Sequence, residues 1–233
     1  EGGIVAGLHV SEGQMVTAGD LLISLDPLQA NASVARHNGQ LDQALARQAR
    51  LESELKGEKN IVLEGQILER LTKQPEMAEM VEAEQKHLMA RLETVDGHIT
   101  ILRLRIEQLN DEIAGLEIQR AARLEQYKIF QDEIVGLRDL YEKGYYPKTK
   151  LLAVERAMVE LRGAAGNDLA QIARAKSSQR ESENQIVSVK NRFREEVLQE
   201  LRRVQVEITD LNERLLVAKD ILQRVQIVAP RSG

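Results

Sequence analysis

The stretch that decides the fold is residues 88–116, LMARLETVDGHITILRLRIEQLNDEIAGL. Apolar residues recur in it in alternating steps of four and three, from Leu88 through Ile99 and Ile106 to Leu116. This spacing places one apolar line along a helix, and four heptads of it indicate a helix that packs lengthwise against another helix. We call this line of positions the seam. It predicts a mainly α-helical chain.

The seam continues to the end of one helix and reappears in a second one. In the first helix it runs on through Arg120, Arg123 and Ile134 to Tyr141, and after a break at residues 143–147 it runs from Leu151 to Val225. Near Phe193 and Val197 the spacing slips by an extra four residues, a stutter that locally unwinds a supercoil. Because only five residues separate the two helices, we predict an antiparallel coiled-coil hairpin.

Proline positions set the predicted boundaries. The four prolines stand at 27, 75, 147 and 230, and proline is tolerated at a helix start but not inside a helix. We therefore expect a β-rich head (1–26), a helical hairpin domain (27–225) and a β tail (226–233). Within the hairpin domain the expected helices are 28–56, 77–142 and 147–225, the tip is 140–147, and 57–76 is an irregular loop. The first helix is expected beside the base of the hairpin, making three helices; the alternative is a coaxial first helix with a bulge.

Composition narrows the function classes. The chain has 233 residues, 37 acidic and 32 basic side chains, and no cysteine. A mildly acidic chain with interspersed charges argues against a nucleic-acid partner. Without cysteine there is no disulfide, thiolate nucleophile or zinc–thiolate site. No apolar run is long enough to span a membrane.

Two basic residues interrupt the seam and predict a register-setting layer. Setting Leu137 opposite Leu151 and Leu116 opposite Ile172 places Arg120 opposite Asp168, and Arg123 opposite Ala165. A polar layer of Arg120, Arg123 and Asp168 in an apolar seam fixes register more than it adds stability. We expect a structural role for it, not a catalytic one.

The head carries the most specific motif. Residues 10–26 follow V-x-E-G-x-x-V-x-x-G-D-x-L-x-x-L-D, in which short strands alternate with turns at Gly13 and Gly19 and end at Asp26. This pattern resembles the first half of a biotinyl or lipoyl carrier domain, and residues 225–233 resemble the opening of its second half. In the carriers a modified Lys follows such a strand. Pro27 stands there in this chain, so the resemblance implies a connector and not a cofactor carrier.

A long hairpin between two lipoyl-like halves resembles the periplasmic membrane fusion proteins, most of all the HlyD-type adaptors of type I secretion. The resemblance implies an adaptor in the periplasm, anchored to the bacterial inner membrane by segments outside this fragment. It would bridge an inner-membrane ABC transporter and a TolC-like outer-membrane channel as a homo-oligomeric, sixfold ring. An unfolded secreted protein would pass through the ring, and no cofactor would be needed.

The tip departs from the common adaptor pattern. Many adaptors for TolC-like channels carry an Arg, a Leu four residues on and a Ser seven residues after that, and only Leu140 matches here. The tip instead resembles that of adaptors for protease and lipase exporters. The resemblance implies a channel-docking site, and exposed tyrosines on a rigid end suit docking. The candidate residues are Leu140, Gly144, Tyr145, Tyr146 and Pro147; the alternative is that Gly144 and Pro147 merely make the turn.

Nothing in the sequence predicts an enzyme or a metal site. The four histidines, His9, His37, His87 and His98, lack ligand spacing, and the many Asp and Glu residues suit solvated helix faces. Three other functions stay open: an EmrA-like adaptor of a multidrug efflux pump, a purely structural coiled coil, and a lipoyl-type carrier. The split β domain argues against the second, and Pro27 against the third.

Overall fold

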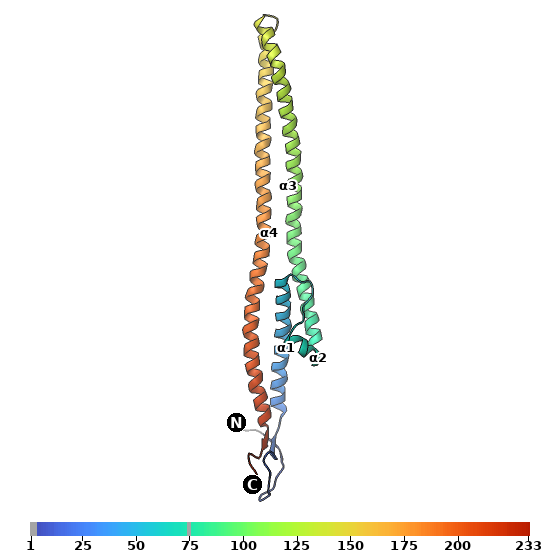
Figure 1. The fold of residues 1–233 in the computed structure, drawn as a ribbon, viewed down its shortest axis with the longest axis vertical. Helices are drawn as coiled ribbons and strands as arrows, with labels where there is room; N and C mark the ends of the chain where they lie inside the picture. The colour runs from blue at the N-terminus through green and yellow to red at the C-terminus, as the bar shows by residue number, and fades with distance from the viewer. Residues whose placement is uncertain (1–3, 74–75) are drawn as a thin grey trace. The chain divides into compact units, whose positions relative to one another are not determined.

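The computed structural model describes residues 4–73 and 76–233 (Figure 1). Pro75, one of the predicted punctuation points, lies outside the described residues. The chain forms two compact units, one made of the residues up to Glu93 together with Phe193–Gly233, and the other of Thr94–Arg192. The elements are β1 (Val5–Leu8), β2 (Leu21–Leu25), α1 (Leu28–Lys56), α2 (Gln66–Lys73), α3 (Glu76–Glu142), α4 (Lys148–Arg224) and β3 (Gln226–Val228).

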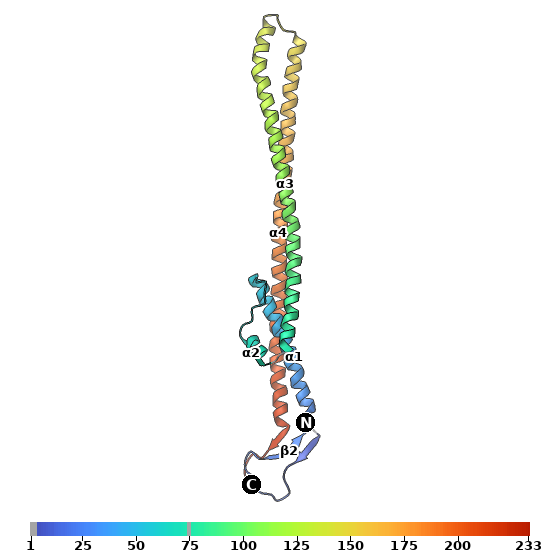
Figure 2. The same ribbon diagram turned by 90° about the vertical axis from the view of Figure 1, so that its right-hand side faces the viewer.

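The Thr94–Arg192 unit is a two-helix hairpin. The part of α3 after Thr94 and the part of α4 before Arg192 lie side by side in both views (Figures 1 and 2). The contacts between the two helices run in opposite order along them, since Arg138 pairs with Glu155 and Glu117 pairs with Lys176. The hairpin is therefore antiparallel, as the seam predicts.

The seam forms the interior of this hairpin. Ile113 of α3 packs with Ile172 and Ala175 of α4, and Leu109 and Leu116 cover the same cluster. Every predicted seam residue is buried or half-buried except Tyr141, which lies at the tip. The apolar period thus identified the buried face of both helices.

In the other unit, α1 packs against the first turns of α3 and the last turns of α4. Leu41 and Leu45 of α1 share a buried cluster with Met77 of α3 and with Leu211 and Leu215 of α4. Nearer its end, Leu51 of α1 packs on Val197 and Val204, with Phe193 beside them. The stutter near Phe193 and Val197 therefore lies where the last turns of α1 are packed.

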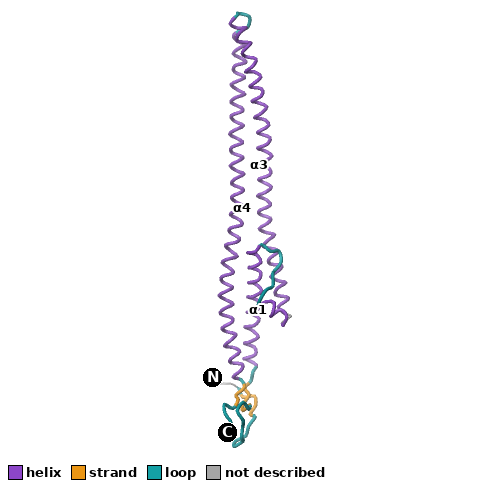
Figure 3. The backbone as a smooth tube through the Cα atoms, viewed as in Figure 1, coloured by secondary structure: helices purple, strands orange, loops and turns teal. Residues whose placement is uncertain are grey.

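A three-stranded antiparallel sheet, orange in Figure 3, joins the head to the tail. Strand β2 lies between β1 and β3. Leu21 is the register partner of Val228, and Val5 that of Leu25. Backbone hydrogen bonds extend the pairing beyond the strands, because Val16 and Gly233 bond to each other in both directions and Gly19 donates to Ala229. Head and tail fold together although about 200 residues separate β2 from β3.

One expectation about the helices was wrong. Residues 57–76 were expected to form an irregular loop, but they contain the eight-residue helix α2, so the described residues hold four helices. Ile67 of α2 is buried in the cluster of α1 and Leu71 covers it. These two residues are one helical turn apart and lie on the same face of the short helix.

Candidate functional site

The tip is closed by a backbone motif that needs glycine. Gly144 has φ +83°, in the left-handed region. Its N–H donates to the carbonyl of Tyr141, and the N–H of Tyr145 donates to the carbonyl of Leu140, both at 2.9 Å. These two bonds form a Schellman motif, which ends a helix by satisfying its last free carbonyls. The tip is therefore a short, defined turn.

The outer surface of the tip is aromatic. Tyr145 is 80% exposed and Leu140 is 42% exposed, whereas Tyr146 is half-buried. Pro147 precedes α4, and its carbonyl accepts the N–H of Lys150 at 3.1 Å. One turn further from the tip, Arg138 donates to Glu155 at 2.8 Å and ties the two helices together. Tyr145 is thus presented outward on a braced support.

Two glycines form tight turns in the head. Gly13 and Gly19 have φ +81° and +97°, a conformation that other residues rarely adopt. At the second turn the Thr17 N–H donates to Asp20 Oδ2 at 2.7 Å, and that hydrogen bond lowers the pKa of Asp20. Asp26 Oδ1 accepts the N–H of Leu28 at 2.9 Å, directly before α1 begins.

The polar layer in the seam has a different partner from the one expected. Arg123, not Arg120, binds Asp168: its Nη1 donates to both carboxylate oxygens at 2.7 and 2.8 Å and to the Ala164 carbonyl at 3.1 Å. Helical side chains lean toward the N-terminus of their own helix. In an antiparallel pair this lean carries Arg123 away from the tip and Asp168 toward it, so that they meet. Asp168 is 2% exposed.

Sequence reasoning missed an ion-pair network centred on Arg50, which is 1% exposed. Arg50 of α1 donates to a carboxylate on each of three helices, at 2.6 to 2.8 Å: Glu54 of α1, Glu84 of α3 and Glu200 of α4. Arg91 adds a second cation, 3.0 Å from Glu200, and lies 5.4 Å from the centroid of the Phe193 ring. We call these residues the Arg50 network.

The electrostatics of the Arg50 network favour its charged form. Burial alone would lower the pKa of Arg50, but hydrogen bonds to Glu54 and Glu84 leave it raised. Burial alone would raise the pKa of Glu200, but the charge of Arg50 and the hydrogen bonds from Arg50 and Arg91 leave it lowered. Both shifts favour the charged forms, the guanidinium of Arg50 and the carboxylate of Glu200.

Smaller polar contacts hold the segment between α1 and α3. Ser53 Oγ accepts the Val62 N–H at 3.0 Å. Gln85 of α3 accepts the Ile61 N–H at 2.8 Å and donates to the Lys59 carbonyl at 2.9 Å. An ion pair between Arg70 and the buried Asp42 fastens α2 to α1.

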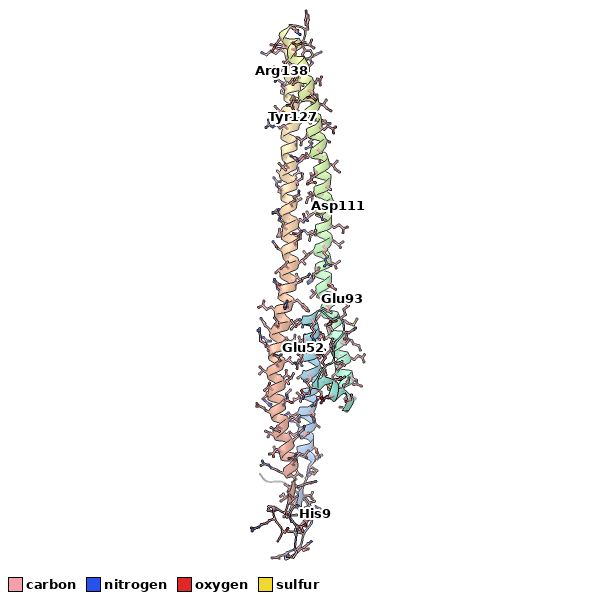
Figure 4. All side chains as sticks on the ribbon, viewed as in Figure 1. His9, Glu52, Glu93, Asp111, Tyr127 and Arg138 are labelled. Atoms are coloured by element: carbon pink, nitrogen blue, oxygen red, sulfur yellow. The ribbon has the colours of Figure 1, made fainter. Side chains whose placement is uncertain are left out.

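Neither a metal centre nor a membrane-spanning helix is found where the structure describes the chain. Within residues 4–73 and 76–233, no three His, Asp or Glu side chains gather to hold a metal ion. No helix in the same ranges is long and apolar enough to cross a membrane. His9, labelled in Figure 4, lies 3.0 Å from the Ser24 hydroxyl.

Comparison with known proteins identifies the family. Residues 30–221 match the family described as AprE, long alpha-helical hairpin. The chain is 34% identical over its full length to the type I secretion system membrane fusion protein PrsE of Rhizobium meliloti, of which it covers 53%. It is 30% identical over its full length to the alkaline protease secretion protein AprE of Pseudomonas aeruginosa, of which it covers 54%. The chain thus spans about half the length of these relatives.

A solved structure has the same fold. The soluble domain of LipC, a membrane fusion protein of a type I secretion system, superposes with a TM-score of 0.92 at 23% identity, covering 99% of this chain and 86% of LipC. The periplasmic adaptor protein EmrA is more distant, with a TM-score of 0.53 at 20% identity, covering 99% of this chain and 61% of EmrA. The family match covers most of the hairpin, and the chain therefore belongs to the AprE-type long alpha-helical hairpin family.

Proposed function

We propose that this chain is the hairpin part of the adaptor subunit of a type I secretion system. It acts in the periplasm, as part of a protein that is anchored to the inner membrane. It bridges an inner-membrane ABC transporter and a TolC-like outer-membrane channel, and a secreted protein passes through a ring of identical copies. The observation that supports this proposal is the match of the whole chain to about half of PrsE and of AprE, both of which are named as secretion proteins.

In this proposal the three-stranded sheet is half of a lipoyl-like connector domain. The glycine turns at Gly13 and Gly19 support this assignment. Pro27, where a carrier would hold its modified Lys, directly precedes α1 and has no amine to acylate. The connector would then be non-enzymatic and need no cofactor. Helices α3 and α4 would link the tip to the connector along the chain.

The tip is the proposed docking site for the outer-membrane channel. Tyr145 offers a large exposed ring on a turn closed by backbone hydrogen bonds. An aromatic side chain with few rotatable bonds gains contact area at low entropic cost. The Arg123–Asp168 pair is proposed to fix the register that keeps both sides of the tip level.

Site-specific cross-linking tests this proposal, since the chain has no native cysteine. Tyr145→Cys and the control Gln119→Cys, both at exposed positions, are each placed in the intact protein in cells that carry the channel. We expect a cross-link to the channel from Tyr145→Cys alone. If a functional exporter gives no such product, tip docking is wrong and a structural coiled coil becomes the better interpretation.

An efflux adaptor predicts a different cargo for the same fold. The likeness to EmrA is at 20% identity and supports the fold alone. A secretion assay and a drug-sensitivity assay on a deletion strain separate the secretion adaptor from the efflux adaptor. Deletion of the gene should block secretion of a protein substrate and leave drug sensitivity unchanged.

A further inference from the structure

The exposed charges of the hairpin are separated between its two helices. In the α3 part, residues 94–142, ten acidic and four basic side chains are exposed. In the α4 part, residues 148–192, nine basic and three acidic side chains are exposed. One side of the hairpin is thus acidic and the other basic, although the chain as a whole is only mildly acidic.

The hairpin pairs only a few of these charges within itself. Among the described residues, Glu117 and Asp139 are the only exposed acids of the α3 part that form ion pairs, and Lys176 is the only exposed cation of the α4 part that does so. The remaining charges face solvent in a single chain. Opposite charges across two copies would attract, and like charges would repel.

Each helix carries a second regular line of exposed residues away from the seam. We define the α3 stripe as the positions from Ile101 to Asp139 in alternating steps of three and four. We define the α4 stripe as the positions from Lys148 to Lys190 in alternating steps of four and three. Every residue of both stripes is exposed except Glu155, which is half-buried. Asp111, on the α3 stripe, lies on the side of α3 turned away from α4 (Figure 4).

Both stripes mix charge with apolar or very small residues. The α3 stripe contains Ile101, Ile118 and Ile129, which are 60 to 73% exposed. It has four acids and no cation, whereas the α4 stripe has five cations and two acids. Gly115 and Gly136 of the α3 stripe have open space where a Cβ would lie. Nothing in the chain's own packing requires these helix-weakening glycines.

The two stripes match each other in register. Charged residues recur every fourteen positions on each stripe. If two hairpins stand side by side with their tips level, these charged residues face each other. The register of these pairs differs by one residue from the register of the seam within each hairpin. The resulting pairs are Asp139 with Lys148, Glu125 with Arg162, and Asp111 with Lys176. Asp139 and Lys176 would each add this contact to an exposed ion pair within their own hairpin. The neighbouring positions pair Gly136 with Leu152, Ile129 with Val159, and Ile101 with Val187.

A hollow supports the fit near the tip. A groove of about 480 Å³ lies on α4 and is lined by Leu152, Glu155 and Val159 of the α4 stripe, among others. The matching part of the α3 stripe offers Ile129 as an apolar projection and Gly136 as a gap. Asp132 falls opposite Glu155, a carboxylate that Arg138 of its own hairpin already binds at 2.8 Å.

We propose that the α3 stripe of one copy docks on the α4 stripe of a second copy, with both tips at the same level. This inference rests on the self-association in the proposed function. The contact joins two different surfaces, so it repeats around a ring. The α3 stripe lies two positions after its seam and the α4 stripe one position after its seam. At about 100° per residue, the two stripes therefore face directions about 120° apart when viewed down the hairpin. In a closed ring of six copies, each copy contacts its two neighbours in directions about 120° apart. A two-fold dimer would instead set like charges together.

Disulfide trapping in the intact membrane-bound protein tests the register. With Ile129→Cys and Val159→Cys in one chain, oxidation should give dimers and higher products. The same chemistry with Ile129→Cys and Val187→Cys, which lie at different levels, should give almost none. Equal yields from both pairs, or a strong dimer from Ile129→Cys alone, would overturn the proposal.

Charge exchange tests the attraction. The variant Glu125→Lys/Asp139→Lys reverses two charges of the α3 stripe, and Lys148→Glu/Arg162→Glu reverses the two charges of the α4 stripe that they would face. Each variant alone should lose about tenfold of the trapped product, and co-expression of the two should restore it, because each altered stripe then meets an opposite charge. The matched control Glu112→Lys/Glu133→Lys changes exposed charges off the stripe and should trap like the parent.

The outcomes separate this interface from the proposed function. If Tyr145→Cys still cross-links to the channel while trapping is insensitive to level and to charge exchange, the secretion adaptor stands and the interface falls. If trapping follows the stripes but Tyr145→Cys finds no channel, the interface stands and tip docking falls. Circular dichroism of each variant checks that the exposed substitutions leave the helices intact.

Discussion

Arg50 of α1 donates from Nη2 to Glu200 of α4 at 2.8 Å across a separation of 150 residues. The same guanidinium reaches Glu84 of α3 through Nε at 2.6 Å. A single buried side chain therefore ties together three helices. Replacing one partner of a buried pair leaves the other charge without compensation, which costs more than the pair itself contributes.

Arg50→Ala should lower the free energy of unfolding by about 3–5 kcal/mol, because Glu54 would remain buried without its hydrogen-bonded cation and with only Arg91, 3.7 Å away, as a partner. Denaturant unfolding followed by circular dichroism measures this. Arg47→Ala is the matched control on the same helix, because Arg47 forms a more exposed ion pair with Glu207 and should cost less than about 1 kcal/mol. Similar losses for the two variants would contradict the central role of Arg50.

Acid should weaken the same region. The pKa of Glu200 is lowered in the folded chain, so the stability that it contributes is present above its unfolded pKa of about 4.3 and is lost as the pH falls through the folded value. Unfolding midpoints between pH 7 and pH 3 should fall most steeply below about pH 4. Glu200→Gln should flatten this dependence, and an unchanged slope would exclude Glu200 as a contributor.

Asp168→Ala should destabilise the hairpin by about 1–3 kcal/mol, because Arg123 would lose its carboxylate partner and water would solvate it incompletely. Thermal unfolding of the variant is the measurement. Arg120→Ala serves as control, since no ion pair joins Arg120 to Asp168 among the described residues. A larger loss at Arg120 than at Asp168 would restore the pairing expected from the seam alone.

Gly144→Ala should cost about 1–2 kcal/mol, because φ +83° is unfavourable for a residue with a Cβ. Gly97→Ala should instead stabilise by up to about 1 kcal/mol, since Gly97 lies inside α3 with open space at its Cβ position. Melting temperatures of the two variants should thus shift in opposite directions. Shifts of the same sign would refute the special role of the tip turn.

Tyr145→Ala should abolish or strongly reduce secretion and leave the melting temperature unchanged, because the side chain is 80% exposed and adds little to folding. A secretion assay and a thermal melt on the same variant measure the two effects. Lys150→Ala, at another exposed position near the tip, is the control and should secrete normally. Normal secretion by Tyr145→Ala would remove Tyr145 from the proposed docking site.

The apolar period predicts most of the fold because burial in a long hairpin has one dominant cause. Seam residues such as Ile113 and Ile172 pack against each other, and their spacing is visible in the sequence. The period does not show which way a side chain leans along its helix. For that reason the partner of Asp168 was misplaced by one turn, from Arg123 to Arg120.

Contacts among polar residues on different helices leave little trace in the sequence. Arg50, Glu84 and Glu200 resemble the many charged residues on solvated faces, and only the packing of α1 between α3 and α4 brings them together. Helix α2 was missed for a related reason. It is eight residues long, and its anchors are Ile67 and Leu71, fewer than a periodic pattern needs to stand out.

The position of β2 has a consequence for how the chain folds. β2 lies between β1 and β3, and β3 begins about 200 residues after β2 ends in the sequence. Closing so large a loop is slow for an unstructured chain, whereas helices form from local contacts. We therefore expect the hairpin to form first and deliver β3 to the edge of β2. Refolding kinetics should show helix formation in a fast phase, with the last β-strand added in a slower one.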